Sequence, residues 1–162
     1  MLAGPFILGD TTFSKRKSDK LHDDSALMRY MTLGMLQRPV RAPKEILLGY
    51  TLEKFLFGTW KGPGGKDEPA GESIEQTTAR EVEAEIGVQV LAQERAGLIE
   101  FRFTSGKVLP VYVQRITKWR GNPHAMDAMA PQWFPMDALP SPMPPADAIW
   151  LPKYLSDGKV NG

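Results

Sequence analysis

Residues 71–88 read GESIEQTTAREVEAEIGV and hold the clearest periodic pattern of this 162-residue chain. Apolar or small side chains recur there at every fourth position, which predicts a helix with one buried stripe. The stripe consists of Ile74, Thr78, Val82 and Ile86. Ser73 followed by Gln76 forms a capping-box start, and Gly87 is a suitable C-terminal stop. The segment is therefore expected to be helical over 74–86.

Two carboxylates of this expected helix share one face. At about 100° per residue, Glu81 and Glu85 lie only about 40° apart around the helix axis, whereas Glu83 points about 160° away from Glu81. Carboxylates this close repel each other unless a cation lies between them, and their hard oxygens favour Mg²⁺ or Mn²⁺. Position 84 faces the same side but holds Ala84. The spacing indicates a candidate metal site; the alternative is an ordinary solvated acidic face.

The same string resembles the sequence box of the Nudix hydrolases, G-x5-E-x7-R-E-U-x-E-E-x-G-U, in which U is a bulky aliphatic residue. The matching positions are Glu72, Arg80, Glu81, Val82, Glu85, Gly87 and Val88. Two features depart from the box. Ala84 stands where the family has the first of two adjacent glutamates, and six residues rather than five separate Gly65 from Glu72.

Composition limits the kinds of protein this chain can be. Its length and its 42% hydrophobic content suit one domain with a core. A net charge of +1 gives no general attraction to nucleic acid or membranes, and no apolar run reaches the roughly 18 residues that span a bilayer. The absence of cysteine excludes disulfides and thiolate chemistry. We expect a soluble cytoplasmic protein with no stable nucleic-acid or membrane partner.

The order of elements predicts an α/β protein. Residues 1–25, with a basic run at 14–20, are expected to be an N-terminal extension before a domain at 26–162. Strands are expected at 28–36, 45–50, 89–93, 97–103, 108–117 and 132–136, a loop at 52–71 and a second helix at 146–155. Pro110 favours an edge or a bulge in its strand. Together with the Nudix resemblance, this order implies an α/β/α sandwich around a mixed β-sheet.

Three further segments resemble the Nudix branch that hydrolyses oxidised purine nucleoside triphosphates. They are TWKGPGGK at 59–66, PQWF at 131–134 and DAIWLP at 147–152. This resemblance implies a pyrophosphohydrolase that converts a nucleotide such as 8-oxo-dGTP to the monophosphate and pyrophosphate. It also implies Mg²⁺ as the cofactor, with Mn²⁺ as an alternative, in a monomer or a homodimer.

The resemblance assigns roles residue by residue. The metal would be held by Glu81, Glu85 and the carbonyl of Gly64. Arg80 would pair with Glu72, with Gly87 as a structural member of the box. The phosphates would lie against Gly65 and Lys66, since glycines allow close backbone approach and expose amide donors. The base would be surrounded by Thr32, Phe55, Lys61, Trp133 and Asp147.

Several departures keep a second hypothesis open. Ala84 removes an expected metal ligand, and Ala128 stands where the branch has a further glutamate, with Asp127 one position away. The chain could therefore be a Nudix-fold nucleotide-binding protein with impaired turnover, whether Ala84 is natural or engineered. Lys61 replaces an asparagine that contacts the base in this branch. For Asp147 the alternative to base reading is a helix cap.

Overall fold

The computed structural model describes residues 6–8, 30–53, 56–67 and 71–161. The basic run at 14–20 lies outside these residues. In chain order the elements are β1 (Phe6–Leu8), β2 (Met31–Arg38), β3 (Glu45–Thr51), β4 (Trp60–Lys61), α2 (Ile74–Ile86), β5 (Gln89–Phe103), β6 (Val108–Arg120), β7 (Met129–Pro135), α3 (Asp147–Asp157) and β8 (Val160–Asn161).

The strands form one mixed sheet, as the sequence predicts. Its central order is β1-β5-β6-β2-β3-β4, with β7 paired to β3 and β8 paired to β5. β2 runs parallel to β6, whereas β5 and β6 are antiparallel. β2 and β3 pair only at Gln37–Ile46 and Arg38–Glu45. Over the first part of β2 another segment of chain must therefore satisfy the backbone groups on that side.

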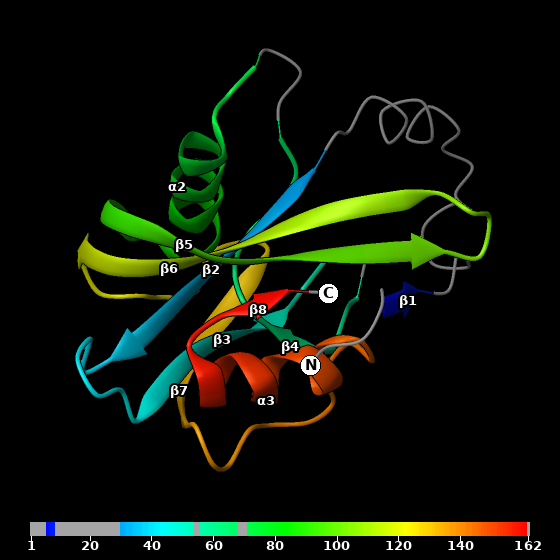
Figure 1. Cartoon of the computed structure of the whole chain (residues 1–162). Coiled ribbons are helices and arrows are strands. Elements are labelled where there is room, and N and C mark those ends of the chain that lie inside the picture. Colours follow the sequence, from blue (N-terminus) through cyan, green and yellow to red (C-terminus); the bar gives the residue numbers. More distant parts are fainter. Residues whose placement is uncertain (1–5, 9–29, 54–55, 68–70, 162) are drawn as a thin grey trace.

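Helices α2 and α3 cover opposite faces of the sheet, with α2 above it and α3 below it in Figure 1. Strand β2 serves both faces because successive side chains point to opposite sides. It sends Leu36 to a buried cluster with Val82 and Ile86 of α2. It sends Met35 to a second cluster with Trp150 of α3. The expected α/β/α sandwich is confirmed.

β5 differs from the expectation. Residues 89–103 form one strand rather than two, because pairing with β6 continues through register shifts between Val90 and Ala92 and between Arg95 and Gly97. These irregularities break the period-2 alternation that a sequence pattern needs. Pro110 pairs with Glu100 in β5 without a shift, and β2 pairs only from Val111 onward. At the proline, the internal strand β6 therefore has a neighbour on one side alone.

The remaining differences are in length. β6 and β7 extend beyond the expected ranges, and β4 and β8, of two residues each, were not expected. Such short strands are fixed by their partners and leave no periodic signal. Strand β1, which falls within the expected extension 1–25, pairs in parallel with β5. Within the described part of the chain, no helix is long and apolar enough to cross a membrane.

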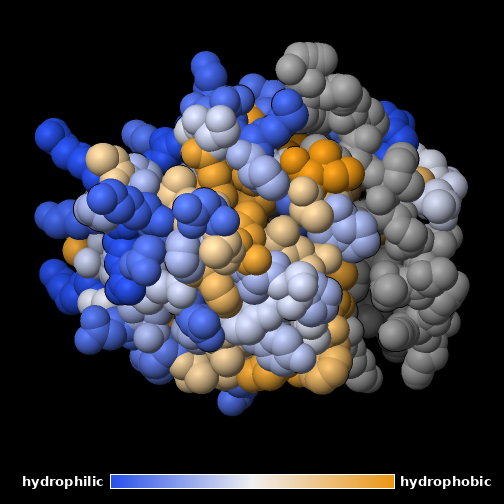
Figure 2. All heavy atoms as spheres, turned by 90° about the horizontal axis from the view of Figure 1, so that it is seen from below, coloured by the Kyte–Doolittle hydropathy of each residue, from blue (hydrophilic) through white to orange (hydrophobic). Residues whose placement is uncertain are grey.

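Figure 2 shows the molecule from the side of α3. Apolar side chains form a band across the middle of this face, and hydrophilic side chains gather at its left edge. On α3, Ile149 has 58% of its surface accessible, whereas Trp150 and Tyr154 are buried against the sheet.

Candidate active site

Helix α2 carries the acidic face and is defined at both ends by its sequence. The amide of Gln76 donates to Ser73 Oγ at 3.1 Å, and the amide of Ser73 donates to Gln76 Oε1 at 2.9 Å. The predicted capping box is therefore confirmed. Gly87 ends the helix with a φ of 77°, a conformation that favours glycine. Of the predicted stripe, Ile74 is only half-buried, while its other three members are buried.

A glycine-containing segment, which we call the glycine loop (residues 62–67), fills the gap beside the first part of β2. The amide of Thr32 donates to the carbonyl of Gly65 at 2.8 Å, and that of Gly34 donates to the carbonyl of Pro63 at 2.7 Å. The loop thus pairs with β2 where β3 has diverged, and it is held next to α2.

The glycine loop approaches both carboxylates of α2 closely. The amide of Gly64 donates to Glu85 Oε1 at 2.8 Å. A Cβ atom at Gly65 would lie 2.5 Å from Glu81 Oε1, so a larger residue there would displace the Glu81 carboxylate. Pro63 and Gly65 turn their carbonyls toward β2, and the alternation of extended backbone directs the Gly64 carbonyl to the opposite side, that of Glu85.

Arg80 clamps the loop to the helix. Its guanidinium makes two hydrogen bonds of 2.8 Å to the Glu72 carboxylate and one of 2.6 Å to Glu81 Oε2. It also donates to the carbonyl of Lys66 at 3.1 Å. The hydrogen bonds to Glu72 raise the pKa of Arg80, so the clamp stays charged. The expected pairing of Arg80 with Glu72 is present in the structure.

Glu85 is partly buried between α2 and the glycine loop. Its burial raises the pKa of the carboxyl group, while the charge of Lys61 and the amide of Gly64 act in the opposite direction. Ala84 is exposed and supplies no ligand. Within the described residues, no three Asp, Glu, His or Cys side chains are grouped to hold a metal ion.

The donor set nevertheless fits a hard divalent cation. Two carboxylates and one backbone carbonyl are oxygen donors, and the loop leaves no side chain between them, because any Cβ at Gly65 would meet Glu81. Mg²⁺ in nucleotide-processing sites is typically bound by one or two carboxylates plus substrate phosphates and water. Glu81, Glu85 and Gly64 would therefore be able to hold such an ion together with a phosphate chain.

Asp147 lies at the start of α3, where burial raises its pKa to about 6. Trp150 donates from Nε1 to Asp147 Oδ1 at 3.0 Å, and the charge of Lys61 also acts on this carboxylate. Helix α3 has no side-chain cap, because its N-cap position is Ala146. The capping role for Asp147 is therefore wrong: its carboxylate faces Trp150.

The structure does not bring all expected base-binding residues together. Gly34 faces Val82 of α2, and the alternation along β2 places Thr32 on that same face, where its hydroxyl is buried without a partner. Trp133 also lies on the α2 face, with the Arg38 guanidinium 4.1 Å above its ring. Asp147 lies on the opposite face. Phe55 falls outside the described residues.

Sequence patterns missed three residues that organise the site. Tyr30 donates its hydroxyl to the carbonyl of Glu72 at 2.9 Å and so fixes the residues that lead into α2. Trp150 orients Asp147, which its position three residues later on a helix could have indicated. Trp60 packs edge-on against Phe134 at 4.9 Å, on the face of Asp147. Lys66, expected at the phosphates, has an exposed side chain.

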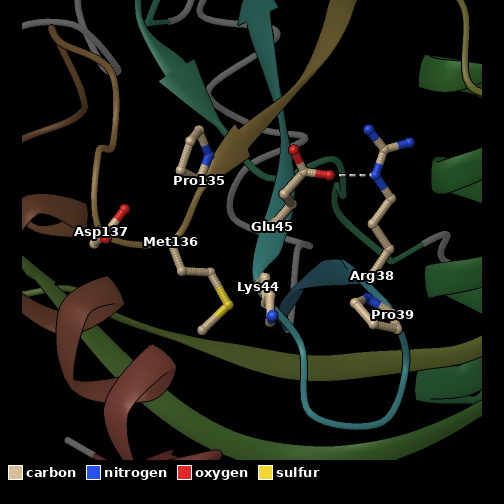
Figure 3. A pocket seen from close by; sticks show the side chains of 7 residues that line it. All are labelled: Arg38, Pro39, Lys44, Glu45, Pro135, Met136 and Asp137. Atoms are coloured by element: carbon tan, nitrogen blue, oxygen red, sulfur yellow. Dashed lines mark hydrogen bonds and ion pairs between the residues drawn. The ribbon is translucent and has the colours of Figure 1, made fainter.

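A separate cavity of about 840 Å³ opens at the far end of β2 (Figure 3). Its lining residues are Arg38, Pro39, Lys44, Glu45, Pro135, Met136 and Asp137. The Glu45 carboxylate is paired with Arg38 at 2.5 Å. The glycine loop lies at the other end of the strand, so this cavity is distinct from the carboxylate site.

Comparisons with known proteins agree with this geometry. The chain matches the family model described as NUDIX domain over residues 38–154. It is 36% identical over 122 residues to an oxidized purine nucleoside triphosphate hydrolase of Danio rerio, covering 74% of this chain and 78% of that protein. The corresponding mouse protein (Mus musculus) is 34% identical over 125 residues, covering 76% and 80%.

A solved structure shares the fold. The crystal structure of a MutT NUDIX hydrolase from Burkholderia pseudomallei superposes with a TM-score of 0.65 at 26% identity, and it covers 75% of this chain and 93% of that one. Nudix hydrolases generally use divalent metal ions, in agreement with the oxygen donors found between α2 and the glycine loop.

Proposed function

Since the chain belongs to the Nudix hydrolase family, we propose that it is a Mg²⁺-dependent pyrophosphohydrolase of oxidised purine nucleoside triphosphates such as 8-oxo-dGTP. The observation that carries the proposal is the approach of the glycine loop to Glu81 and Glu85, with the Gly64 amide 2.8 Å from Glu85. The substrate class is supported by the relatives from Danio rerio and Mus musculus, which are named for oxidized purine nucleoside triphosphates.

Each residue has a distinct part in the proposed reaction. Glu81 and Glu85, with the Gly64 carbonyl, would bind the cation, which when bound polarises phosphoryl oxygens and acidifies a water molecule. Gly65 and the backbone of Lys66 would lie against the phosphate chain, because a loop without side chains permits that approach. Arg80 holds loop and helix in register. Water would attack one phosphorus and pyrophosphate would leave, giving the monophosphate.

The base is proposed to lie on the α3 face rather than near Thr32 and Trp133. There Asp147 offers a buried carboxyl group and Lys61 a donor, beside the apolar side chains of Trp60 and Leu33. A carboxylate accepts from purine N–H groups, and its protonated form can also donate. A raised pKa allows both states near neutral pH.

A pyrophosphate-release assay over normal and oxidised nucleoside triphosphates, with and without Mg²⁺ or Mn²⁺, tests the proposal. Metal-dependent release with higher efficiency on oxidised purines is expected. The exposed Ala84 favours a second candidate, a nucleotide-binding protein without turnover. That candidate would be supported by nucleotide binding with no release in either metal.

Replacing Asp147 by asparagine is expected to stabilise the protein at pH 8. In the folded protein the carboxyl group has a pKa of about 6, above its unfolded value. The stability that its protonated form gives the folded state is therefore fully present below about pH 4 and is lost as the pH rises through 6. The asparagine side chain stays neutral and still accepts from Trp150. The gain at pH 8 should be about 2–3 kcal/mol and should vanish toward pH 4, as measured by urea unfolding at both pH values.

The same variant tests base reading. If Asp147 contacts the base, Asp147→Asn should change the ratio of kcat/KM between oxidised and normal purine triphosphates by about 10- to 100-fold, since a buried polar group left unpaired is costly. Asp157, exposed at the end of the same helix, provides the matched control, and Asp157→Asn should leave both stability and ratio alone. An unchanged ratio in Asp147→Asn would count against the base-reading role.

A further inference from the structure

Thr77 of α2 is a buried threonine whose hydroxyl is directed at a carboxylate outside its own helix. Its Oγ1 donates to Glu72 Oε1 at 3.0 Å. The next residue, Thr78, is equally buried, but its Oγ1 donates to the carbonyl of Ile74 at 2.8 Å, a bond that threonines inside helices commonly make. A helical threonine has two accessible χ1 rotamers. In Thr77 the hydroxyl is thus turned to the carboxylate that also binds Arg80.

The hydroxyl of Tyr30 completes this arrangement. It donates to the carbonyl of Glu72 at 2.9 Å and lies 3.0 Å from Thr77 Oγ1. Each hydroxyl has a single proton to donate. Because a carboxylate is a stronger acceptor than a neutral oxygen, Thr77 donates to the side chain of Glu72, while Tyr30 donates to its backbone. The two hydroxyls therefore hold the side chain and the backbone of Glu72 together.

Tyr30 is itself fixed between the sheet and the glycine loop. Its ring packs edge-on against Tyr112 of β6, with the ring centres 5.7 Å apart. The amide of Asp67 donates to the carbonyl of Tyr30 at 3.2 Å, and the amide of Tyr30 donates to Asp67 Oδ1 at 3.4 Å. Tyr30 thus connects the last residue of the glycine loop to Glu72.

Hydrogen bonds continue from Glu72 to a candidate metal ligand. Both oxygens of the Glu72 carboxylate accept from Arg80 at 2.8 Å, and Arg80 Nη1 donates to Glu81 Oε2 at 2.6 Å. The other oxygen of Glu81, Oε1, lies beside Gly65, where a Cβ atom would be 2.5 Å from it. The direction of the Glu81 carboxylate therefore depends on Arg80, and that of Arg80 depends on Glu72.

We propose that Thr77 and Tyr30 are positioning residues of the candidate metal site: they hold Glu72 so that Arg80 keeps one oxygen of Glu81 directed to the glycine loop. Thr77 is one of the seven unspecified residues between the Glu72 and Arg80 positions of the Nudix box, so its contact is a property of this chain. A carboxylate that is already oriented loses less freedom when a cation binds. The consequence for catalysis rests on the proposed function.

The test uses the whole protein and removes one hydroxyl at a time. Thr77→Val keeps the shape of the side chain without the hydroxyl, and Thr77→Ser keeps the hydroxyl. Tyr30→Phe removes the other hydroxyl and provides a second variant should Thr77→Val fail to fold. Thr78→Val is the matched control, because Thr78 is equally buried and bonds within its own helix.

The first measurement is the rate at which the Nε proton of Arg80, which is donated to Glu72 Oε2, exchanges with water. It is followed by ¹⁵N NMR in the metal-free protein, and the signal is identified by its loss in Arg80→Lys. Thr77→Val and Tyr30→Phe should speed this exchange about three- to tenfold, as expected for the loss of one hydrogen bond. Thr77→Ser and Thr78→Val should keep the parent rate.

The second measurement is the affinity for Mn²⁺ without nucleotide, by electron paramagnetic resonance. Groups bonded directly to a metal ligand typically contribute about 10- to 100-fold. Thr77 acts through Glu72 and Arg80, so Thr77→Val should weaken Mn²⁺ binding by less, about three- to tenfold. Thr77→Ser should restore the affinity.

Unchanged exchange of the Arg80 proton or unchanged Mn²⁺ affinity in Thr77→Val would overturn the inference, and so would equal losses in Thr78→Val. A hydroxyl that only stabilises the fold would lower the melting temperature and leave both measurements alone. The Arg80 signal requires neither metal nor substrate. It therefore decides the inference even if the parent protein released no pyrophosphate, a result that would contradict only the proposed function.

Discussion

Glu85→Gln is expected to lower metal-dependent kcat/KM by about a hundredfold or more, and Glu81→Gln to act in the same direction. With Ala84 in the chain, these two side chains carry most of the negative charge available to the cation. Losses in the surroundings of metal ligands alone typically cost about 10- to 100-fold, and a ligand should cost more. Steady-state rates and Mn²⁺ binding of each variant provide the measurement.

The fold should survive these changes. Glutamine is nearly as good a helix former as glutamate, and its Oε1 still accepts from the Gly64 amide. Glu83, exposed on the other side of α2, gives the matched control, and Glu83→Gln should keep the parent rate. If both Glu81→Gln and Glu85→Gln retained full metal-dependent activity with unchanged melting temperatures, the ligands would have to lie elsewhere.

Ala84→Glu is expected to raise turnover by about 10- to 100-fold, provided that the parent protein is slow. The residue is exposed on the acidic side of α2, so a longer side chain meets no packing barrier. A third carboxylate would complete the family cluster and give the site net negative charge. Side-by-side kinetics of the two forms, with Mg²⁺ titrated, measure the effect.

Ala84→Gln separates ligand charge from side-chain size. It has the length of glutamate without the negative charge, and so should stay close to the parent rate. If Ala84→Glu were no faster than the parent protein, the idea that the site lacks one ligand would be wrong. The loss of turnover, if any, would then have to arise from another position, such as Ala128.

The part of the structure that the sequence predicts well is the part governed by local rules. In α2 the capping pair, the buried stripe and the terminal glycine all indicate the same helix, and its bounds are confirmed. The pairing of Arg80 with Glu72 is predicted from the same stretch of sequence as that helix. The structure of such a segment can be predicted from its sequence because independent local signals agree.

The base-binding residues are harder to predict from the sequence, because their positions depend on which face of a strand each residue occupies. A shift of one position moves a side chain to the other side of a sheet. Thr32 and Trp133 therefore fall on the α2 face, although they lie next to Leu33 and Phe134, which pack on the α3 face. Resemblance to a motif indicates which segment lies near the site, but not which face of the sheet each of its residues occupies.

Contacts between segments far apart in the sequence cannot be predicted from local patterns, because they form only in the folded protein. The charge of Lys61 acts on the carboxyl groups of Glu85 and Asp147, which are far from it along the chain, so this influence arises only in the folded protein. The two-residue strands β4 and β8 likewise exist because longer partners hold them.

The glycine loop has two duties that cannot be separated. It faces the candidate metal site, and it also closes the seam of the sheet where β2 leaves β3, through the amides of Thr32 and Gly34. Natural variation at residues 62–65 is thus constrained twice, once by chemistry and once by folding. New substrate preferences in this scaffold would have to be acquired at its margins, at positions such as Lys61 and Asp147, where a side chain can change without opening the sheet.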